Sequence, residues 1–459
     1  MELDMTKGSP LKLISRFIIP LIIGNIFQQL YSMVDTIIVG RFVGVDALAA
    51  VGATGSICFL ILGFTQGLTT GFTVLTAQRF GASDLDGMRK SIANAAFLSV
   101  GVTVLMTTVS ICCMDWLLTI MNTPADIYTM TKEYIIIICH GICCSVLYNI
   151  LASILRAIGN SVVPLVLLVI SSVLNIVLDY VLIVYVHMGV GGAAMATVIS
   201  QGVSGILCLI YIIKKVPLLH VAKHHWSPDI QCMGNQLRIG IPMALQFSIT
   251  AIGTILVQSA LNLLGSVVVA SYSVSCKVEQ LVTQPFLAMG ATMATYSAQN
   301  RGINDLDRIR KGVRIANIMS AIYAVVVYFV VCAILPYAIR LFITEDIDMV
   351  YGYAKTYIEL CGLFFIPLGM IFIYRNTMQG CGYAFLPMMG GVVELVVRSV
   401  VAFIAAKMLS YVGVCIANAG AWLGAGIFLW ICYAFVLKKM IRDKEKYETA
   451  QGQVARKSI

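Results

Sequence analysis

The segment AQRFGASDLDGMRK, residues 77–90, decides the fold because it occurs twice. It returns as AQNRGINDLDRIRK at residues 298–311, an offset of 221 (298 − 77), with Ala, Gln, Gly, Asp, Leu, Asp, Arg and Lys unchanged. Three further features repeat in the same order: Pro20 with Pro242 at an offset of 222, Gly159 and Pro164 with Gly382 and Pro387 at 223, and Lys214-Lys215 with Lys438-Lys439 at 224. Four matches in order indicate an internal duplication.

The composition around this repeat is that of a membrane protein. Of the 459 residues, 59% are hydrophobic and 12% are charged, whereas roughly a quarter of a soluble domain is charged. Apolar runs that can each cross a bilayer, at roughly 20 residues per crossing, fall at about 13–40, 48–78, 91–114, 133–156, 162–186, 190–213, 237–263, 268–298, 313–336, 354–380, 385–408 and 412–437. We therefore expect an all-α integral membrane protein with twelve transmembrane helices. The 14 cysteines are expected to be free and to pack as small apolar side chains.

The duplication and the hydropathy together predict the organisation of the chain. Six helices per half is an even number, so the two halves should form parallel repeats about an axis along the membrane normal. We expect a first half at 1–215, a connector at 216–236, a second half at 237–440 and a solvated tail at 441–459.

The placement of basic residues predicts the orientation. With the N-terminus inside, the cytoplasmic segments hold about 23 of the 31 Lys and Arg. Both termini are therefore expected in the cytoplasm and the protein in the inner (plasma) membrane. The net charge of +9 is explained by this orientation, without nucleic-acid binding.

Two carboxylates interrupt the apolar runs of the first half. Asp35 and Asp179 each lie inside a predicted helix, where an acid costs about 2.5–3.5 kcal/mol. Asn175 precedes Asp179 by four residues and shares its face, and Thr197 lies at a comparable depth in the next run. Two carboxylates in a dry pocket cannot both ionise cheaply, so these four residues are predicted to take up a proton or a cation. The alternative is a hydrogen-bond network that only fixes helix packing.

The second half does not copy this set, because Arg398 stands where the repeat would place Asn175. Glu394 and Arg398 are four residues apart and can neutralise each other, which favours a structural pair first and a gating or substrate role second. Lys277, Glu279 and Arg375 are further candidates for buried charges, and Arg375, near an inner helix end, could instead reach the membrane surface. Other polar or aromatic side chains could line a solute path, bridge helices or simply pack: Tyr31, Gln246, Gln258, Lys277, Glu279 and Gln284.

The remaining candidate sites are weak. The connector carries His220, His224 and His225, but no Cys or carboxylate beside them completes a metal-ligand set. No metal is therefore expected, beyond Na⁺ at the four-residue set, and no other cofactor. A Walker motif and a catalytic motif are both missing, so the chain is not predicted to be an enzyme.

The sequence resembles the multidrug and toxic compound extrusion (MATE) family over essentially its whole length. The likeness is carried by Pro20 through Gly40, including Gln28-Gln29-Leu30-Tyr31 and Val34-Asp35-Thr36, by LAAVG at 48–52, by LRAIG at 155–159 and by both copies of the repeated segment. In the DNA-damage-inducible-F-like branch, an Asp in helix 1, an Asn and an Asp four apart in helix 5 and a Thr in helix 6 form an N-lobe cation site. Asp35, Asn175, Asp179 and Thr197 match these positions one by one. The acidic pair that another branch carries in helices 7 and 10 is missing.

The resemblance implies both an architecture and an activity. It implies a V-shaped pair of six-helix lobes in which helix 1 bends at Pro20. It also implies a monomeric secondary antiporter that exchanges H⁺ or Na⁺ for cytoplasmic organic cations or amphiphilic drugs by alternating access. A lipid-linked oligosaccharide flippase of the same superfamily is the alternative, with Lys277, Arg375 and Arg398 as cations for a pyrophosphate. A membrane-embedded enzyme, a third hypothesis, is disfavoured by the parallel repeats and the missing catalytic motif.

Overall fold

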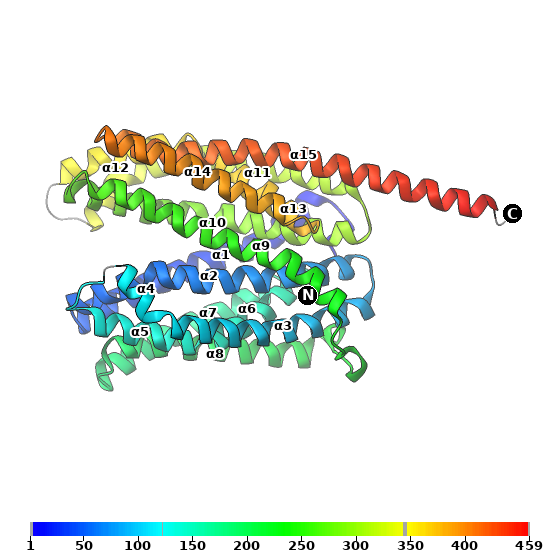
Figure 1. Ribbon diagram of the computed structural model, residues 1–459, viewed down its shortest axis with the longest axis horizontal. Helices are drawn as coiled ribbons and strands as arrows, with labels where there is room; N and C mark the ends of the chain where they lie inside the picture. The colour runs from blue at the N-terminus through cyan, green and yellow to red at the C-terminus, as the bar shows by residue number, and fades with distance from the viewer. Residues whose placement is uncertain (1–2, 122, 343–346, 458–459) are drawn as a thin grey trace. The chain divides into compact units, whose positions relative to one another are not determined.

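The computed structural model describes residues 3–121, 123–342 and 347–457, and every regular element in these ranges is helical (Figure 1). The first half contains α1 (Pro10–Phe42), α2 (Val45–Gly81), α3 (Leu85–Cys112), α4 (Met114–Ile120), α5 (Tyr128–His140), α6 (Ile142–Ala157), α7 (Val162–Tyr180), a π-helical turn (Val181–Tyr185) and α8 (Gly189–Lys215). The second half contains α9 (Ile230–Asn262), α10 (Ser266–Gly302), α11 (Leu306–Phe342), α12 (Ile347–Gly362), α13 (Phe365–Gly380), α14 (Phe385–Lys407) and α15 (Tyr411–Lys457).

These helices account for the twelve predicted crossings. Within the described ranges, nine helices are long and apolar enough to cross a membrane, and two bent helix pairs raise the number to eleven. The twelfth is α10, which has 37 residues, as α2 has in the first half. α10 is less apolar because it carries side chains such as Lys277, Glu279 and Gln280.

Two of the predicted helices are broken at equivalent points of the repeat. α5 and α6 meet at Gly141 with a bend of 46°, and α12 and α13 meet beside Phe364 with a bend of 50°. These breaks, 223 residues apart (364 − 141), therefore belong to the repeat itself. A side chain at Gly141 would place its Cβ 2.1 Å from Val198 Cγ2 of α8, so glycine permits the close packing of α8 at the break.

The chain divides into two compact units whose boundaries differ from those of the sequence halves. The first unit comprises Asp4 and Arg16–Ala251, and the second comprises Met5–Ser15 and Ile252–Ile459. The connector and most of α9 therefore pack with the first half, while residues 5–15 pack with the second. Met5 is fully buried in the second unit, where its carbonyl oxygen accepts hydrogen bonds from Asn300 Nδ2 at 3.2 Å and from Arg308 Nε at 3.1 Å.

The start of α9 is held by a row of glycines on α2. Gly63, Gly67 and Gly71 recur every four residues and so lie on one helix face. A Cβ at Gly67 would lie 2.7 Å from Ala244 Cα, and one at Gly71 would lie 2.4 Å from Gly240 Cα. The two backbones are therefore in direct contact, which any larger side chain would prevent.

Two other expectations concern the tail and the cysteines. The segment after residue 440, predicted to be a solvated tail, is the continuation of α15 as a helix to Lys457, and it runs past the other helices of its unit (Figure 1). The cysteines are free, as predicted, and many are buried among apolar side chains.

Candidate ion and substrate site

The four residues predicted to bind an ion come from three helices of the first unit. On α7, Ser172, Asn175 and Asp179 are at most 5% exposed and follow one another every three or four residues, so they form a polar stripe on the inner face. The outer face of α7 carries exposed apolar side chains, namely Val166, Ile170, Val173 and Val177. This division explains why α7 turns its acid toward the interior. The π-helical turn begins two residues after Asp179.

The acids and the amide lie together. Asp35 of α1 and Asp179 of α7 are electrostatic neighbours, and Asn175 Nδ2 donates to Thr197 Oγ1 of α8 at 3.5 Å. Among the described residues, Asp35 Oδ1, both carboxyl oxygens of Asp179 and Asn175 Oδ1 are buried and have no hydrogen-bond donor. These four buried oxygens are suited to binding a proton or Na⁺, because hard cations prefer oxygen ligands.

A cavity adjoins this cluster within the same unit. It has a volume of about 210 Å³ and is lined by residues of α1, α2, α6, α7 and α8. Asn175, Thr197 and Tyr31 lie in its wall, as do Pro20 and the cationic side chain of Arg156. Asp35 and Asp179 do not line it, so the acids lie behind the residues that face the cavity.

Sequence analysis missed one polar residue of this cluster. Tyr134 of α5 is 8% exposed and is an electrostatic neighbour of Asp35, Asp179 and Tyr31. The repeat carried a signal for it, because Tyr134 aligns with Tyr357 at an offset of 223 (357 − 134).

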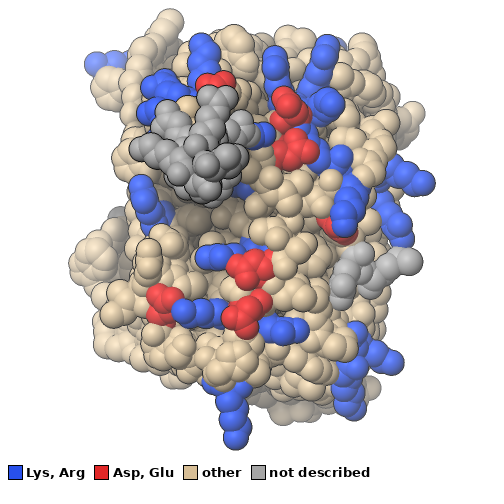
Figure 2. Space-filling model, turned by 90° about the vertical axis from the view of Figure 1, so that its right-hand side faces the viewer, with Lys and Arg blue, Asp and Glu red and all other residues tan. Residues whose placement is uncertain are grey.

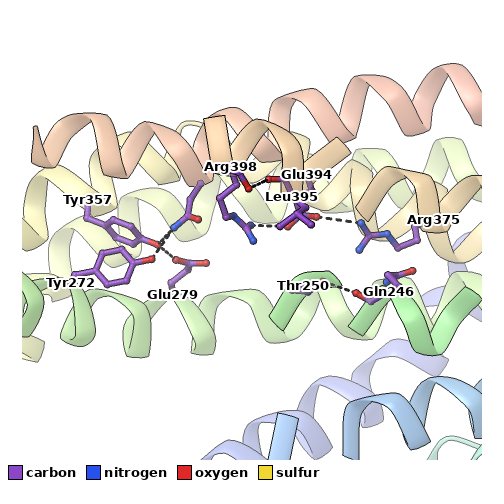
Figure 3. Close-up of polar contacts among 11 residues, drawn as sticks. Gln246, Thr250, Tyr272, Glu279, Tyr357, Arg375, Glu394, Leu395 and Arg398 are labelled. Atoms are coloured by element: carbon purple, nitrogen blue, oxygen red, sulfur yellow. Dashed lines mark hydrogen bonds and ion pairs between the residues drawn. The ribbon is translucent and has the colours of Figure 1, made fainter. Parts of the chain in front are cut away.

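The second unit holds a buried charge cluster instead (Figure 3). The predicted pair is formed, since Arg398 Nη2 donates to Glu394 Oε1 at 2.8 Å. Arg375 is a buried charge, one of the two alternatives for it: its side chain is 5% exposed, and its Nη2 lies 3.4 Å from Glu394 Oε2. It cannot reach the surface because α13 directs it toward α14. The Nε–H groups of both arginines have no acceptor among the described residues, at a cost of about 1–3 kcal/mol for each buried donor.

Glu279 of α10 belongs to the same region. Its carboxylate accepts a hydrogen bond from the Tyr357 hydroxyl and lies near Arg398. Asn418 Nδ2 donates to the hydroxyl groups of both Tyr272, at 3.0 Å, and Tyr357, at 3.2 Å.

The other candidates for a solute path are not brought together. Lys277 is exposed, whereas Gln246, Gln258 and Gln284 are half-buried at separate places on α9 and α10. Gln284 Nε2 donates to the Gln280 carbonyl in its own helix at 2.9 Å. None of these four residues lines the cavity of the first unit. A role for them in a solute path therefore stays a prediction.

The connector histidines do meet a carboxylate, contrary to the sequence-based expectation. Asp86 Oδ1 lies 2.7 Å from His225 Nε2 and 3.6 Å from His224 Nε2, because α3 brings Asp86 to the connector. His225 Nδ1 accepts a hydrogen bond from the Ala222 backbone N–H at 3.0 Å, so the proton of the neutral ring is on Nε2. With that proton directed at Asp86, His225 is a hydrogen-bond donor here and not a metal ligand.

The fold and this site define a polytopic membrane protein with buried acids beside an internal cavity. The MatE family model matches residues 20–181 and again residues 242–404. The two matches cover more than half of the chain, so the protein belongs to the MatE family. They begin 222 residues apart (242 − 20) and end 223 apart (404 − 181), which confirms the duplication. Members of this family are transporters, so the protein is a multi-pass membrane transporter and not an enzyme.

Individual relatives agree with this assignment. The chain is 27% identical over 445 residues to the probable multidrug resistance protein YoeA of Bacillus subtilis, covering 95% of this chain and 96% of that protein. It is 25% identical over 406 residues to the probable multidrug resistance protein NorM of Thermotoga maritima, covering 87% and 85%. A crystal structure of MATE in complex with MaL6 has a TM-score of 0.90 at 24% identity, covering 96% of this chain and 99% of that one.

Proposed function

We propose that the protein is a multidrug efflux antiporter that exports organic cations and amphiphilic compounds from the cytoplasm in exchange for H⁺ or Na⁺. The observation that supports this most directly is a pair of neighbouring acids, the half-buried Asp35 and the buried Asp179. They adjoin a cavity in a family whose curated relatives are named multidrug resistance proteins. Both carboxyl oxygens of Asp179 and Oδ1 of Asp35 have no hydrogen-bond partner among the described residues.

The chain's own residues can perform the exchange. When one acid is protonated, it can donate to the other, and the cluster loses a negative charge. With Na⁺, the carboxylates and Asn175 Oδ1 would supply the ligands. In either case a smaller charge lowers the attraction for a cationic substrate in the adjoining cavity. α1 carries both Asp35 and the internal Pro20, and a proline removes one helical hydrogen bond. We expect α1 to bend there as the ion binds.

The available energy suits this activity. Each elementary charge that enters supplies about 2.3 kcal/mol per 100 mV. At 100 mV, a one-for-one exchange with a neutral substrate could thus maintain roughly a 50-fold concentration gradient of that substrate, because each tenfold difference in concentration costs about 1.4 kcal/mol.

We further propose that the protein acts as a monomer in the plasma membrane with both termini in the cytoplasm. Lys and Arg side chains are numerous on the end face drawn in Figure 2, which is the end toward which α15 runs. This agrees with the positive-inside rule.

Transport of ethidium or norfloxacin into inverted vesicles, which corresponds to efflux from the cell, tests the proposal when it is driven separately by a pH gradient and by a Na⁺ gradient. Wild type is compared with Asp35→Asn and with Asp126→Asn, a matched control in which the acid is exposed. We expect efflux under one gradient, which identifies the ion. Asp35→Asn should lose it and Asp126→Asn should keep it.

Other outcomes would change the assignment. Full efflux by Asp35→Asn would remove Asp35 as the coupling group and direct attention to Glu279 and Glu394. Failure of wild type under both gradients would count against drug antiport and favour the flippase alternative, which reconstituted lipid flipping can then address.

A further inference from the structure

Two residues of the charge cluster in the second unit, Glu394 and Arg398, lie at helix positions whose counterparts in the first unit belong to the cavity wall. At an offset of 223, Arg398 corresponds to Asn175 (398 − 175) and Glu394 to Ser171 (394 − 171). Asn175 and Ser171 both line the cavity of the first unit. Glu394 and Arg398 therefore hold positions whose counterparts face a ligand cavity.

The neighbours of the two clusters also correspond. Tyr134, beside the two acids, is the counterpart of Tyr357. Cys58, a neighbour of Tyr134, is the counterpart of Glu279 at an offset of 221 (279 − 58). In the second unit the equivalent contact is the hydrogen bond from the Tyr357 hydroxyl to Glu279. The same arrangement thus recurs with different charges.

One exchange makes room for the arginine. Tyr31, which faces the two acids, is replaced in the repeat by Gly253 at an offset of 222 (253 − 31). A Cβ at Gly253 would lie 2.7 Å from Arg398 Nη1. The guanidinium group of Arg398 therefore occupies space that is free because Gly253 has no side chain. The second unit thus has a cation of its own in the region where the first unit has oxygen atoms that could bind a cation.

The cluster has more cationic donors than acceptors. Arg375 and Arg398, each 5% exposed, share the single carboxylate of Glu394. Each keeps a buried Nε–H without an acceptor among the described residues. Glu279 lies near Arg398, but its hydrogen-bonded partner is Tyr357.

We propose that the second half binds a carboxylate or phosphate group at Arg398, the counterpart of Asn175, and at Arg375. A guanidinium group binds such anions through its N–H donors. Nη2 of each arginine already contacts Glu394, so the buried Nε–H that each keeps without an acceptor among the described residues is the donor available to the anion. Glu394 holds the two guanidinium groups in place. The anion belongs either to a transported solute or to a phospholipid headgroup.

Thermal unfolding of the purified, delipidated protein in maltoside detergent tests this site. The midpoint is measured against inorganic phosphate, benzoate or phosphatidylglycerol, at constant Na⁺ and ionic strength with chloride as the reference. Arg398→Gln removes the cation, and Gly253→Ala keeps every charge but displaces the guanidinium group. Lys407→Gln removes an exposed cation from the same helix and is the matched control.

We expect at least one probe to raise the midpoint of wild type and of Lys407→Gln, with binding weakened about tenfold in Arg398→Gln and in Gly253→Ala. A response to phosphate or benzoate identifies a solute site, and a response to phosphatidylglycerol alone identifies a lipid site. No response in wild type, or an equal response in Gly253→Ala, overturns the proposal. If Arg398→Gln does not fold, Gly253→Ala decides. Asp35→Asn should respond as wild type does, so failure of the efflux assay and failure of this site can be told apart.

Discussion

Replacing Gly71 by alanine tests the packing of α9 on α2, on which the first unit depends. The new Cβ would lie 2.4 Å from Gly240 Cα and 2.8 Å from Gly240 N. Carbon atoms pack best at about 3.5–4.0 Å, so the two backbones would have to separate by about 1 Å or more. Neither contact is with a flexible side chain that could move aside.

The expected change in stability follows from two opposing effects. Overpacking of this kind costs about 1–3 kcal/mol, whereas alanine is favoured over glycine within a helix by about 0.5–1 kcal/mol. The net loss for Gly71→Ala is therefore about 1–2 kcal/mol. Gly55→Ala is the matched control, because Gly55 lies on the same helix and has nothing within 4 Å of its Cβ position. That variant should gain only the helix preference.

The assay is thermal unfolding of the three proteins in detergent, followed by the loss of the monodisperse peak in size-exclusion chromatography. We expect the midpoint to fall in Gly71→Ala and to stay equal or rise in Gly55→Ala. A midpoint for Gly71→Ala at or above that of Gly55→Ala would show that the two helices are not in backbone contact.

Three further predictions concern other parts of the chain. Hydrogen bonds from Lys132 and from the Tyr128 hydroxyl hold the pKa of Asp115 below its usual range. Lys132→Ala should therefore lower the unfolding midpoint near neutral pH, by an amount that disappears as the pH falls below about 4; a pH-independent difference would contradict this. Arg308→Ala removes two hydrogen bonds to the Met5 carbonyl and should speed tryptic cleavage of the N-terminal segment about tenfold, as followed by mass spectrometry. Pro20→Ala should slow drug efflux while leaving drug binding intact if α1 bends there, and an unchanged efflux rate would argue against a hinge.

The parts of the fold that could be predicted are those with a local or repeated signal. The helices follow from hydropathy, and the duplication from direct identity between residues 77–90 and 298–311. The bends at Gly141 and beside Phe364 were not predicted, because each lies inside a continuous apolar run of the sequence. The helical continuation of α15 was missed because its polar sequence was interpreted as a solvated tail.

The candidate site shows the same division. The spacing of Asn175 and Asp179 reveals their shared face, and the structure brings them together with Asp35 and Thr197. Which helices face each other is a tertiary property, and this is why the exposure of Lys277, a candidate for a buried charge, was not foreseen and the approach of Asp86 to the connector histidines was missed. Tyr134 could have been found by aligning every polar residue of the two halves.

The division into compact units also has a consequence for the origin and the assembly of the protein. Each unit contains the segment that leads into the first helix of the other half, since residues 5–15 pack with the second unit and the connector and most of α9 with the first. Such reciprocal exchange is how two copies of one chain become interlocked in a domain-swapped dimer. A duplicated and fused gene would inherit it. Neither unit corresponds to one uninterrupted piece of sequence, so a chain cut at the connector should yield fragments that fold only when produced together.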